Sequence, residues 1–343
     1  MKDKSSSNCS KTKERNRDPL FDNIKALLLF LVALGHSLDM YRQGNVSDDI
    51  VMKYLYLFHM PFFAFITGYF SKDFARARTS AVRFVLVPYL VFQSIYVLLG
   101  TLMIRLGVAK FNADIFKPSI LIPTSAFYYL IAVFFWKSMV GIFKLRYPIA
   151  LSIAAGLLVS TTQETSFHIG YAAVFSLLPF FVLGVRCDHA KVERIRSLPR
   201  WAAMAVLVLG IPLAACLPYS IHNIRMTYAS TGMSNLTGMG YRILFYAIAT
   251  AMSIAVLNLM PARRFGFTRI GEASLLVYCI STILSPHAYR LIEMVFGIPK
   301  SGLLHWLSLL LFCVAVVYGA SLSVFRRLLA SFVSMVCKIV SKE

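Results

Sequence analysis

Long apolar runs separated by short polar segments dominate this sequence. A helix that crosses a bilayer needs about 20 mostly apolar residues, and ten runs approach that length. Helices are the expected form, because the runs are too long and too evenly apolar for the strands of a membrane barrel. The predicted spans are 20–41, 50–70, 84–104, 119–142, 148–163, 167–185, 201–219, 239–260, 271–290 and 302–325.

The composition agrees with a membrane protein. Of the 343 residues, 58% are hydrophobic and only 15% are charged, whereas a typical soluble domain has roughly 45–50% apolar and 25% charged residues. So few charges do not cover the outside of a soluble protein of this size. Because no polar stretch is long enough to fold separately, we expect a single all-α membrane domain.

The charge pattern predicts how the spans are oriented. The net charge is +20, which in a soluble protein would suggest nucleic acid. Here the basic residues lie between apolar runs, so the positive-inside rule is the simpler explanation and no nucleic-acid partner is expected. With the N-terminus inside, the inner segments hold 24 Lys and Arg residues and the outer segments hold 7. We therefore predict that both termini are cytoplasmic and that the protein is a multi-pass protein of the plasma or inner membrane.

The two ends of the chain flank the predicted membrane domain, residues 19–325. Residues 1–18 form a basic cytoplasmic tail, and the apolar run that follows lacks a small-residue cleavage site, so it reads as a retained first helix. In residues 326–343, apolar side chains such as Leu328 and Phe332 fall on one helical face and serines and Lys338 on the other. This pattern predicts an amphipathic helix on the inner membrane surface.

Several kinds of chemistry lack a sequence signal. None of the six cysteines belongs to a CxxC pair, and four lie within or beside apolar runs, so we interpret them as small hydrophobic residues. P-loop, GxGxxG, HExxH and GxSxG motifs are absent from the sequence, which argues against an ATPase, a dinucleotide enzyme or a serine hydrolase. No metal site is expected.

The first predicted span carries an unusual set of ionisable residues. An ionisable group inside a membrane costs at least about 2.5–3.5 kcal/mol on insertion scales. Asp22 and Lys25 are spaced i, i+3 and can neutralise each other. Lys25 and His36 share one helical face about 16 Å apart, and Asp39, one turn beyond His36, is placed to orient the imidazole. His36 is thus a candidate catalytic residue, with a packing role as the alternative.

The second predicted span and the loop after it add further candidates. His59 precedes Pro61, which kinks a helix, and Gly68 allows close helix approach. Two histidines in adjacent spans favour a shared polar cavity, with a kinked packing helix as the alternative reading of the second span. The inner loop contains four basic residues: Lys72, Arg76, Arg78 and Arg83. Their charge is explained by the positive-inside rule alone, or the residues bind a multiply phosphorylated donor.

Three strings of this sequence carry a family resemblance. They are RDPLFDNIKALLLFLVALGHS (17–37), LFHMPFFAFITGYF (57–70) and VRFVLVPYL (82–90). The chain resembles the acyltransferase-3 family of membrane O-acyltransferases, and within it the "fucose 4-O-acetylase-like" branch of bacterial capsule and exopolysaccharide pathways. Weaker landmarks follow in FYYLIAVFFWK, LLPFFVLGVRCDH and IGEASLLVYCIS, so the resemblance runs from about Arg17 to Arg326.

The resemblance implies a bundle of about ten helices and an acyl-CoA donor bound from the cytoplasm. It predicts acetyl transfer from acetyl-CoA to a hydroxyl of a glycan or lipid-linked saccharide. His36 would act as general base or carry the acetyl group, and Arg76, Arg78 and Arg83 would bind the CoA phosphates. Tyr128 and Tyr129 are candidate sugar-stacking residues, with an interfacial aromatic belt as the alternative.

The sequence departs from the family pattern at two positions. The family signature of the first span is an arginine, ten residues and a histidine, and here Lys25 stands in place of the arginine. Lysine keeps the charge but lacks the two-pronged guanidinium fork. In the ninth span many relatives carry a histidine where this chain has Ser281.

Other functions remain open at the level of sequence. A transporter or flippase with a polar central cavity would show similar buried charges, although the absence of internal repeats counts mildly against it. Transfer of another acyl group, such as succinyl, or transfer onto a lipid, is not separated from acetylation of a glycan by these residues, since donor choice depends on pocket volume.

Overall fold

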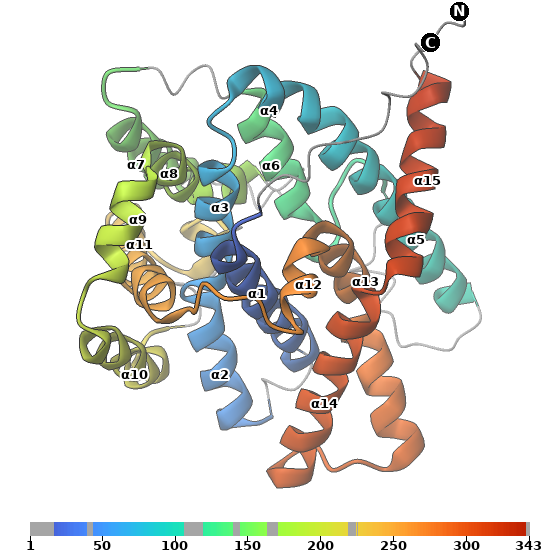
Figure 1. Cartoon of the computed structure of the whole chain (residues 1–343). Helices are drawn as coiled ribbons and strands as arrows, with labels where there is room; N and C mark the ends of the chain where they lie inside the picture. The colour runs from blue at the N-terminus through green and yellow to red at the C-terminus, as the bar shows by residue number, and fades with distance from the viewer. Residues whose placement is uncertain are drawn as a thin grey trace, which may run out of the picture.

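The computed structural model describes residues 17–39, 44–105, 119–139, 145–162, 171–218, 224 and 226–340, and within these ranges it contains helices and no strand (Figure 1). The α-helices are α1 (Pro19–Leu38), α2 (Val46–Tyr56), α3 (His59–Tyr69), α4 (Phe74–Ala81), α5 (Val87–Arg105), α6 (Tyr128–Ser138), α7 (Pro148–Leu158), α8 (Tyr171–Arg186), α9 (His189–Arg196), α10 (Arg200–Cys216), α11 (Asn235–Leu259), α12 (Thr268–Glu272), α13 (Ser274–Phe296), α14 (Gly302–Ala320) and α15 (Ser323–Val340). Single turns are η1 (Val82–Leu86, π-helical), η2 (Ser125–Phe127), η4 (Val159–Thr161) and η6 (Ala229–Thr231).

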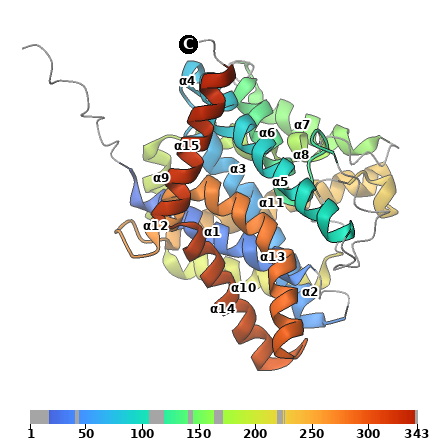
Figure 2. The ribbon, with the colours of Figure 1, turned by 90° about the vertical axis from the view of Figure 1, so that its right-hand side faces the viewer.

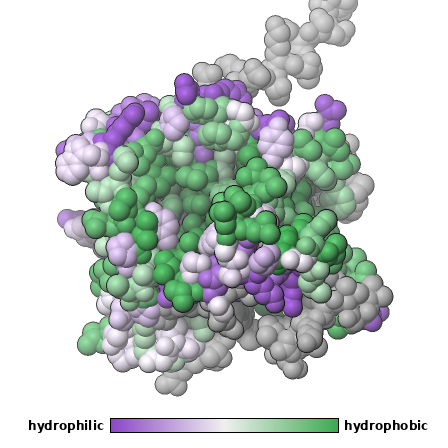
Figure 3. Space-filling model, turned by 90° about the horizontal axis from the view of Figure 1, so that it is seen from below, coloured by the Kyte–Doolittle hydropathy of each residue, from purple (hydrophilic) through white to green (hydrophobic). Residues whose placement is uncertain are grey.

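The helices are those of a multi-pass membrane protein. Five are long and apolar enough to cross a bilayer, and two bent helix pairs raise the number to seven among the described residues. Apolar side chains also reach the surface: Trp201 of α10 is 74% exposed and Leu303 of α14 is 76% exposed. Figure 3 shows one face of the molecule, where apolar side chains cover much of the middle and polar ones gather along an edge. The count of ten spans and the cytoplasmic position of the termini stay predictions.

Two of the predicted spans differ from the structure for identifiable reasons. The span predicted over 50–70 is present as one candidate span, Val46–Tyr69, and begins earlier than predicted. Its helical hydrogen bonding is interrupted at Leu57 and Phe58, because Pro61 has no N–H to bond the carbonyl of Leu57. The span predicted over 119–142 is wrong in its first part, since the helix begins only at Tyr128. Residues before it form a loop whose carbonyls accept hydrogen bonds from Gln93 of α5, and Pro123 disfavours a helix over the preceding residue.

Helix α1 lies at the centre of the bundle and packs against α2, α3, α12, α13 and α14 (Figures 1 and 2). Asp18 caps its first turn by accepting from the N–H of Leu20. The buried amide of Asn23 donates to the carbonyls of Pro261 and Arg263 at 2.9 Å each. A Cβ on Gly271 would lie 1.8 Å from the carbonyl oxygen of Asp22. The glycine is therefore required for the close approach of α12 to the start of α1.

The glycines of the family strings also set the crossing of α3 and α8. A Cβ on Gly68 would lie 2.0 Å from the carbonyl oxygen of Phe181, and one on Gly184 would lie 2.0 Å from that of Phe65. Neither backbone leaves room for a side chain, so the expected close approach at Gly68 is confirmed. This crossing fixes the position of α3, which begins at His59.

The C-terminal segment forms a helix, α15, that begins at Ser323 and packs beside α5 and α13 (Figure 2). Its exposed apolar residues include Val324, Leu328 and Phe332, as the amphipathic pattern predicted. Its place on a membrane surface stays a prediction. The first sixteen residues of the basic tail lie outside the described residues.

Candidate active site

Two histidines from neighbouring helices lie near each other in the bundle. His36 lies near the end of α1 and is half-buried, and His59 begins α3 and is 4% exposed. The ring of Tyr56 packs edge-on against His59, with 4.9 Å between ring centroids. The same tyrosine lies against α1, where a Cβ on Gly35 would come within 3.1 Å of its ring. The imidazoles of His36 and His59 are close enough to interact electrostatically, so the structure brings the two predicted catalytic histidines together.

The break between α2 and α3 fixes the orientation of the His59 ring. Its Nδ1 lies 2.6 Å from the carbonyl oxygen of Leu55. A carbonyl only accepts, so Nδ1 must carry the proton and donate it. In the neutral ring, Nε2 then holds the lone pair, and it has no hydrogen-bond partner in the part of the chain that the structure describes. His59 is therefore arranged as a hydrogen-bond acceptor or base.

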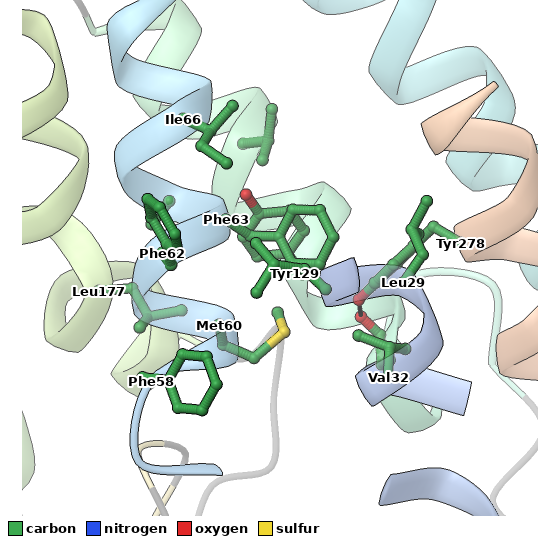
Figure 4. Close-up of a cluster of buried hydrophobic side chains, with 14 of the residues drawn as sticks. Leu29, Val32, Phe58, Met60, Phe62, Phe63, Ile66, Tyr129, Leu177 and Tyr278 are labelled. Carbon is green, nitrogen blue, oxygen red and sulfur yellow. Dashed lines mark hydrogen bonds between the residues drawn. The ribbon is translucent and has the colours of Figure 1, made fainter. Parts of the chain in front are cut away.

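Aromatic and aliphatic side chains of α1, α3, α6, α8 and α13 form a buried cluster next to α1 and α3 (Figure 4). Tyr129 donates to or accepts from the hydroxyl of Thr67 at 2.9 Å, and its ring packs 5.8 Å from that of Tyr278. Figure 4 shows Phe63 and Tyr129 between α3 and α1. Tyr128 and Tyr129 are 8% and 6% exposed. Both tyrosines are thus part of the packed interior, and an interfacial aromatic belt does not describe them.

Lys25 lies with a different group of residues from His36. Its Nζ is 2.5 Å from a carboxylate oxygen of the buried Asp22, so the two charges neutralise each other as their spacing predicted. The ammonium also lies 6.0 Å from the centre of the Phe70 ring. Lys72 lies 3.9 Å above the neighbouring Tyr69 ring. The structure thus groups Lys25 with Lys72 at the beginning of α1, about 16 Å along the helix from His36.

The basic segment after α3, predicted as a loop, is helical over α4 and η1 and forms an exposed surface. Arg76, Arg78 and Arg83 are exposed, and none has an ion-pair partner among the described residues. Arg76 and Arg83 are seven residues apart, about two turns, so they lie on nearly the same side, and Arg78 points elsewhere. Lys137 of α6 reaches this surface and donates to the Ser80 hydroxyl at 3.4 Å. Partial burial against Tyr69 lowers the pKa of Lys72.

Asp39 occupies the end of α1. Its N–H bonds to the carbonyl of Gly35, and its exposed side chain lies one turn beyond His36. Ser37, between the two, donates to the carbonyl of Ser285 at 3.3 Å. That contact ties the end of α1 to α13 where Pro286 bends it, so the position of His36 depends on both helices.

Sequence reasoning missed a buried cluster at the start of α2. His305 of α14 and Asp48 are both fully buried, and His305 Nε2 lies 3.3 Å from Oδ2 of Asp48. The hydroxyl of Tyr289 lies 3.4 Å from the other ring nitrogen and 3.0 Å from the Ser308 hydroxyl. The signal was available in the sequence, because His305 is an ionisable residue within an apolar run.

A second missed residue is Arg242 of α11, which is 5% exposed. It also interrupts an apolar run. In the part of the chain that the structure describes, no three His, Cys, Asp or Glu side chains form a group that would hold a metal ion.

Comparisons with known proteins identify the family. Residues 19–324 match the acyltransferase domain that defines the acyltransferase-3 family. The chain is also 36% identical over 84 residues to the nodulation protein NolL of Sinorhizobium fredii, a match that covers 22% of this chain and 23% of that protein. No solved structure matches the chain. Because the family domain covers nearly all of the sequence, the chain belongs to the acyltransferase-3 family of membrane acyltransferases.

Proposed function

We propose that this protein transfers an acetyl group from acetyl-CoA to a hydroxyl of a cell-surface or lipid-linked saccharide, as capsule and exopolysaccharide O-acetyltransferases do. The observation that carries the proposal is the pair of histidines. His36 and His59 lie together in the interior, and the hydrogen bond to Leu55 leaves Nε2 of His59 as an acceptor. An imidazole with an available lone pair suits proton transfer from a hydroxyl near neutral pH.

The exposed basic surface supports a phosphorylated donor. Arg76, Arg78 and Arg83 have no carboxylate partners among the described residues, so their guanidinium groups are available for phosphate oxygens. Lys72 lies 3.9 Å from the centre of the Tyr69 ring and Lys25 lies 6.0 Å from that of Phe70, so two further ammonium groups lie near the start of α1. From Pro19, His36 lies about 25 Å along α1. The pantetheine arm must therefore extend into the protein, or the acetyl group must be relayed.

The transfer needs one base and one leaving group. The saccharide hydroxyl attacks the thioester carbonyl while a histidine accepts its proton, and the C–S bond breaks to release CoA. The proton held by the imidazole then passes to the departing thiolate, so that an ester and free CoA are the products. In the covalent alternative, His36 first takes the acetyl group and releases CoA, and the hydroxyl then removes the acetyl from the ring.

The two imidazole rings differ in accessibility, and we assign them different roles in the reaction on that basis. His59 is held at one nitrogen and cannot turn without losing its bond to Leu55. His36 is half-buried and so more accessible to a substrate. We assign His36 the direct role with the reacting groups and His59 a supporting acceptor role beside it. Tyr128 and Tyr129 stay the proposed sugar-stacking residues, and because both are buried in the packed interior, a saccharide would have to displace neighbouring side chains to reach them.

The direct test uses purified protein and acetyl-CoA labelled in the acetyl group. Release of CoA thiol that depends on an added saccharide, together with labelled saccharide by mass spectrometry, supports the proposal. Mass spectrometry of surface glycan from cells with and without the gene then identifies the acceptor and the acyl group. A folded protein that moves a saccharide across vesicles but releases no CoA thiol would overturn it in favour of a transporter.

A further inference from the structure

Arg242 presents a charge that the described part of the protein does not neutralise. It lies in α11, a candidate membrane span, and is 5% exposed. Its Nη2 donates to the Ser160 hydroxyl at 3.3 Å, while Nη1 is buried with no hydrogen-bond partner. Arginine stays protonated in proteins, and no carboxylate of the described residues pairs with it. An unneutralised guanidinium inside a membrane bundle is costly.

The surroundings of Arg242 are shaped by two glycines that make room for two tyrosines. A Cβ on Gly238, one turn before Arg242, would lie 2.2 Å from the ring of Tyr228. A Cβ on Gly156 of α7 would lie 2.2 Å from the hydroxyl of Tyr246, one turn after Arg242. Both tyrosines therefore lie in notches in the helix surfaces on either side of the guanidinium.

The groups left unbonded are donors of hydrogen bonds. The hydroxyl of Tyr228 donates to the carbonyl of Leu157 at 3.0 Å and its N–H to that of Ser160 at 2.8 Å, so this residue is anchored. Its ring centre lies 6.0 Å from the guanidinium carbon of Arg242, so Tyr228 already stabilises part of the charge. The buried hydroxyl of Tyr246 has no partner. Arg242 and Tyr246 are one turn apart on α11 and close enough to interact electrostatically, and Nη1 of the first and the hydroxyl of the second are both buried without a hydrogen-bond partner. An oxyanion accepts hydrogen bonds from such donors and neutralises the charge.

Arg242 and Tyr246 lie far from the residues proposed to bind the phosphates of acetyl-CoA. Helix α11 ends beside the start of α1, where Asn23 holds the carbonyls of Pro261 and Arg263. Arg242 lies 17 residues before the last residue of α11, which corresponds to about 25 Å. It is therefore at the opposite end of α11 from Lys25 and Lys72. The ring of Tyr246 packs on Phe180 of α8, the helix that crosses α3.

We propose that Arg242 and Tyr246 bind the anionic group, a carboxylate or a phosphate, of the acceptor saccharide. The inference rests on the proposed function in that it takes the ligand to be the acceptor. It narrows the acceptor to an acidic or phosphorylated saccharide.

Equilibrium binding without acyl-CoA tests the site separately from catalysis. Purified full-length protein is titrated with glucuronate, glucose 1-phosphate or glucose at matched ionic strength, and the thermal unfolding midpoint is recorded. The anionic sugars should raise the midpoint and glucose should not. Which anion binds more tightly distinguishes a carboxylate from a phosphate ligand. Equal shifts with glucose would overturn the proposal.

Substitutions locate the effect. Arg242→Gln should weaken binding of the preferred anionic sugar by about 10- to 100-fold, and Tyr246→Phe should weaken it less. Arg290→Gln, which removes an exposed arginine of α13, is the matched control and should change nothing. A shift that survives Arg242→Gln would come from basic groups elsewhere and would refute the site.

A purely structural role for Arg242 gives a different result. Without ligand, Arg242→Gln should leave the unfolding midpoint unchanged or raise it, since the buried charge is removed. A fall in the ligand-free midpoint would mean that the arginine is paired within the protein. Glu164 lies outside the described residues and is the carboxylate nearest to Ser160 along the chain. The variant Glu164→Gln should bind the anionic sugar as the wild type does. Tighter binding by this variant would show that Glu164 itself occupies the site and would overturn the proposal.

Discussion

Two buried histidine environments in this protein differ in what is left unbonded. His305 is enclosed completely, with Asp48 at one ring nitrogen and Tyr289 at the other. His59 is bonded through Nδ1 to the carbonyl of Leu55, and its Nε2 has no hydrogen-bond partner among the described residues. The half-buried His36 lies beside it. A pair formed by a histidine and a carboxylate usually suggests catalysis. In this protein the pair of His305 and Asp48 is fully buried, so a substrate cannot reach it.

The difference shows that access and an available lone pair indicate chemistry better than the presence of a dyad. A general base must reach the proton that it removes and must have an acceptor nitrogen to receive it. Both ring nitrogens of His305 face protein groups, and the cluster ties α2 to α13 and α14. His305 therefore stabilises the arrangement of helices, whereas His36 and His59 keep the proton-transfer role that we propose for them.

The largest expected effect is on acyl transfer by His36→Ala. Removing a positioned acid–base group costs about 10²–10⁴-fold in rate, and more if the acetyl group is carried on the ring. Expression and the unfolding midpoint should be retained, because losing a polar ring from a membrane helix is not costly in itself. Turnover of acetyl-CoA with saccharide is the measurement. Near-normal turnover by well-folded His36→Ala would leave His36 as a packing residue and would favour the transporter.

His59 provides a sharper version of the same test. In His59→Asn the amide nitrogen can still donate to Leu55, but the base at Nε2 is lost. We expect a smaller loss of rate than in His36→Ala, with the unfolding midpoint preserved. If His59→Asn is the more damaging of the two in steady-state rates, the assigned roles of the two rings are reversed.

The next effect is on stability at the buried cluster. Breaking a buried pair by removing one partner costs about 3–5 kcal/mol in soluble proteins, so Asp48→Asn and His305→Gln should each lower the unfolding midpoint clearly. The protein that remains folded should keep the wild-type KM and turnover per folded molecule. A variant with normal stability and lost turnover would show that the cluster takes part in the reaction, and the contrast between the two histidine environments would fail.

A moderate effect is expected at the exposed arginines. Replacing Arg78 or Arg83 with Gln should raise the KM for acetyl-CoA roughly tenfold, because a charge-assisted hydrogen bond to phosphate is lost, while turnover at saturation changes little. The effect should shrink at high salt, since exposed charges are screened. Arg290→Gln serves as the control. If Arg76, Arg78 and Arg83 all tolerate Gln with unchanged donor kinetics, they are only a topology signal.

The sequence predicted the local features of this protein better than the features that depend on tertiary contacts. Strings such as FHMPFFAFITGYF indicated the family, and i, i+3 spacing was sufficient to pair Asp22 with Lys25, because these signals are local. Periodicity cannot show that the side chain of Gln93 holds residues 119–124 out of a helix. Nor can it show that Lys25 and Lys72 lie on one aromatic cluster, since this depends on tertiary contacts of α1 with α3. The lone pair of His59 depends on a backbone break that Pro61 indicates but does not specify.

The smallest expected effect is a pH dependence of donor binding at Lys72. Partial burial next to the ring of Tyr69 lowers the pKa of Lys72. The Lys72 side chain is still charged at neutral pH. As the pH rises, it loses its charge at a lower pH than an ordinary lysine does. Arg76 and Arg78 remain charged throughout. The dissociation constant of desulfo-CoA, which lacks a titrating thiol, should therefore increase by about two- to fivefold on the alkaline side. Lys72→Arg should flatten this profile, because a guanidinium keeps its charge. A flat wild-type profile, or an identical profile in Lys72→Arg, would remove Lys72 from the donor site and leave its contact with Tyr69 as packing alone.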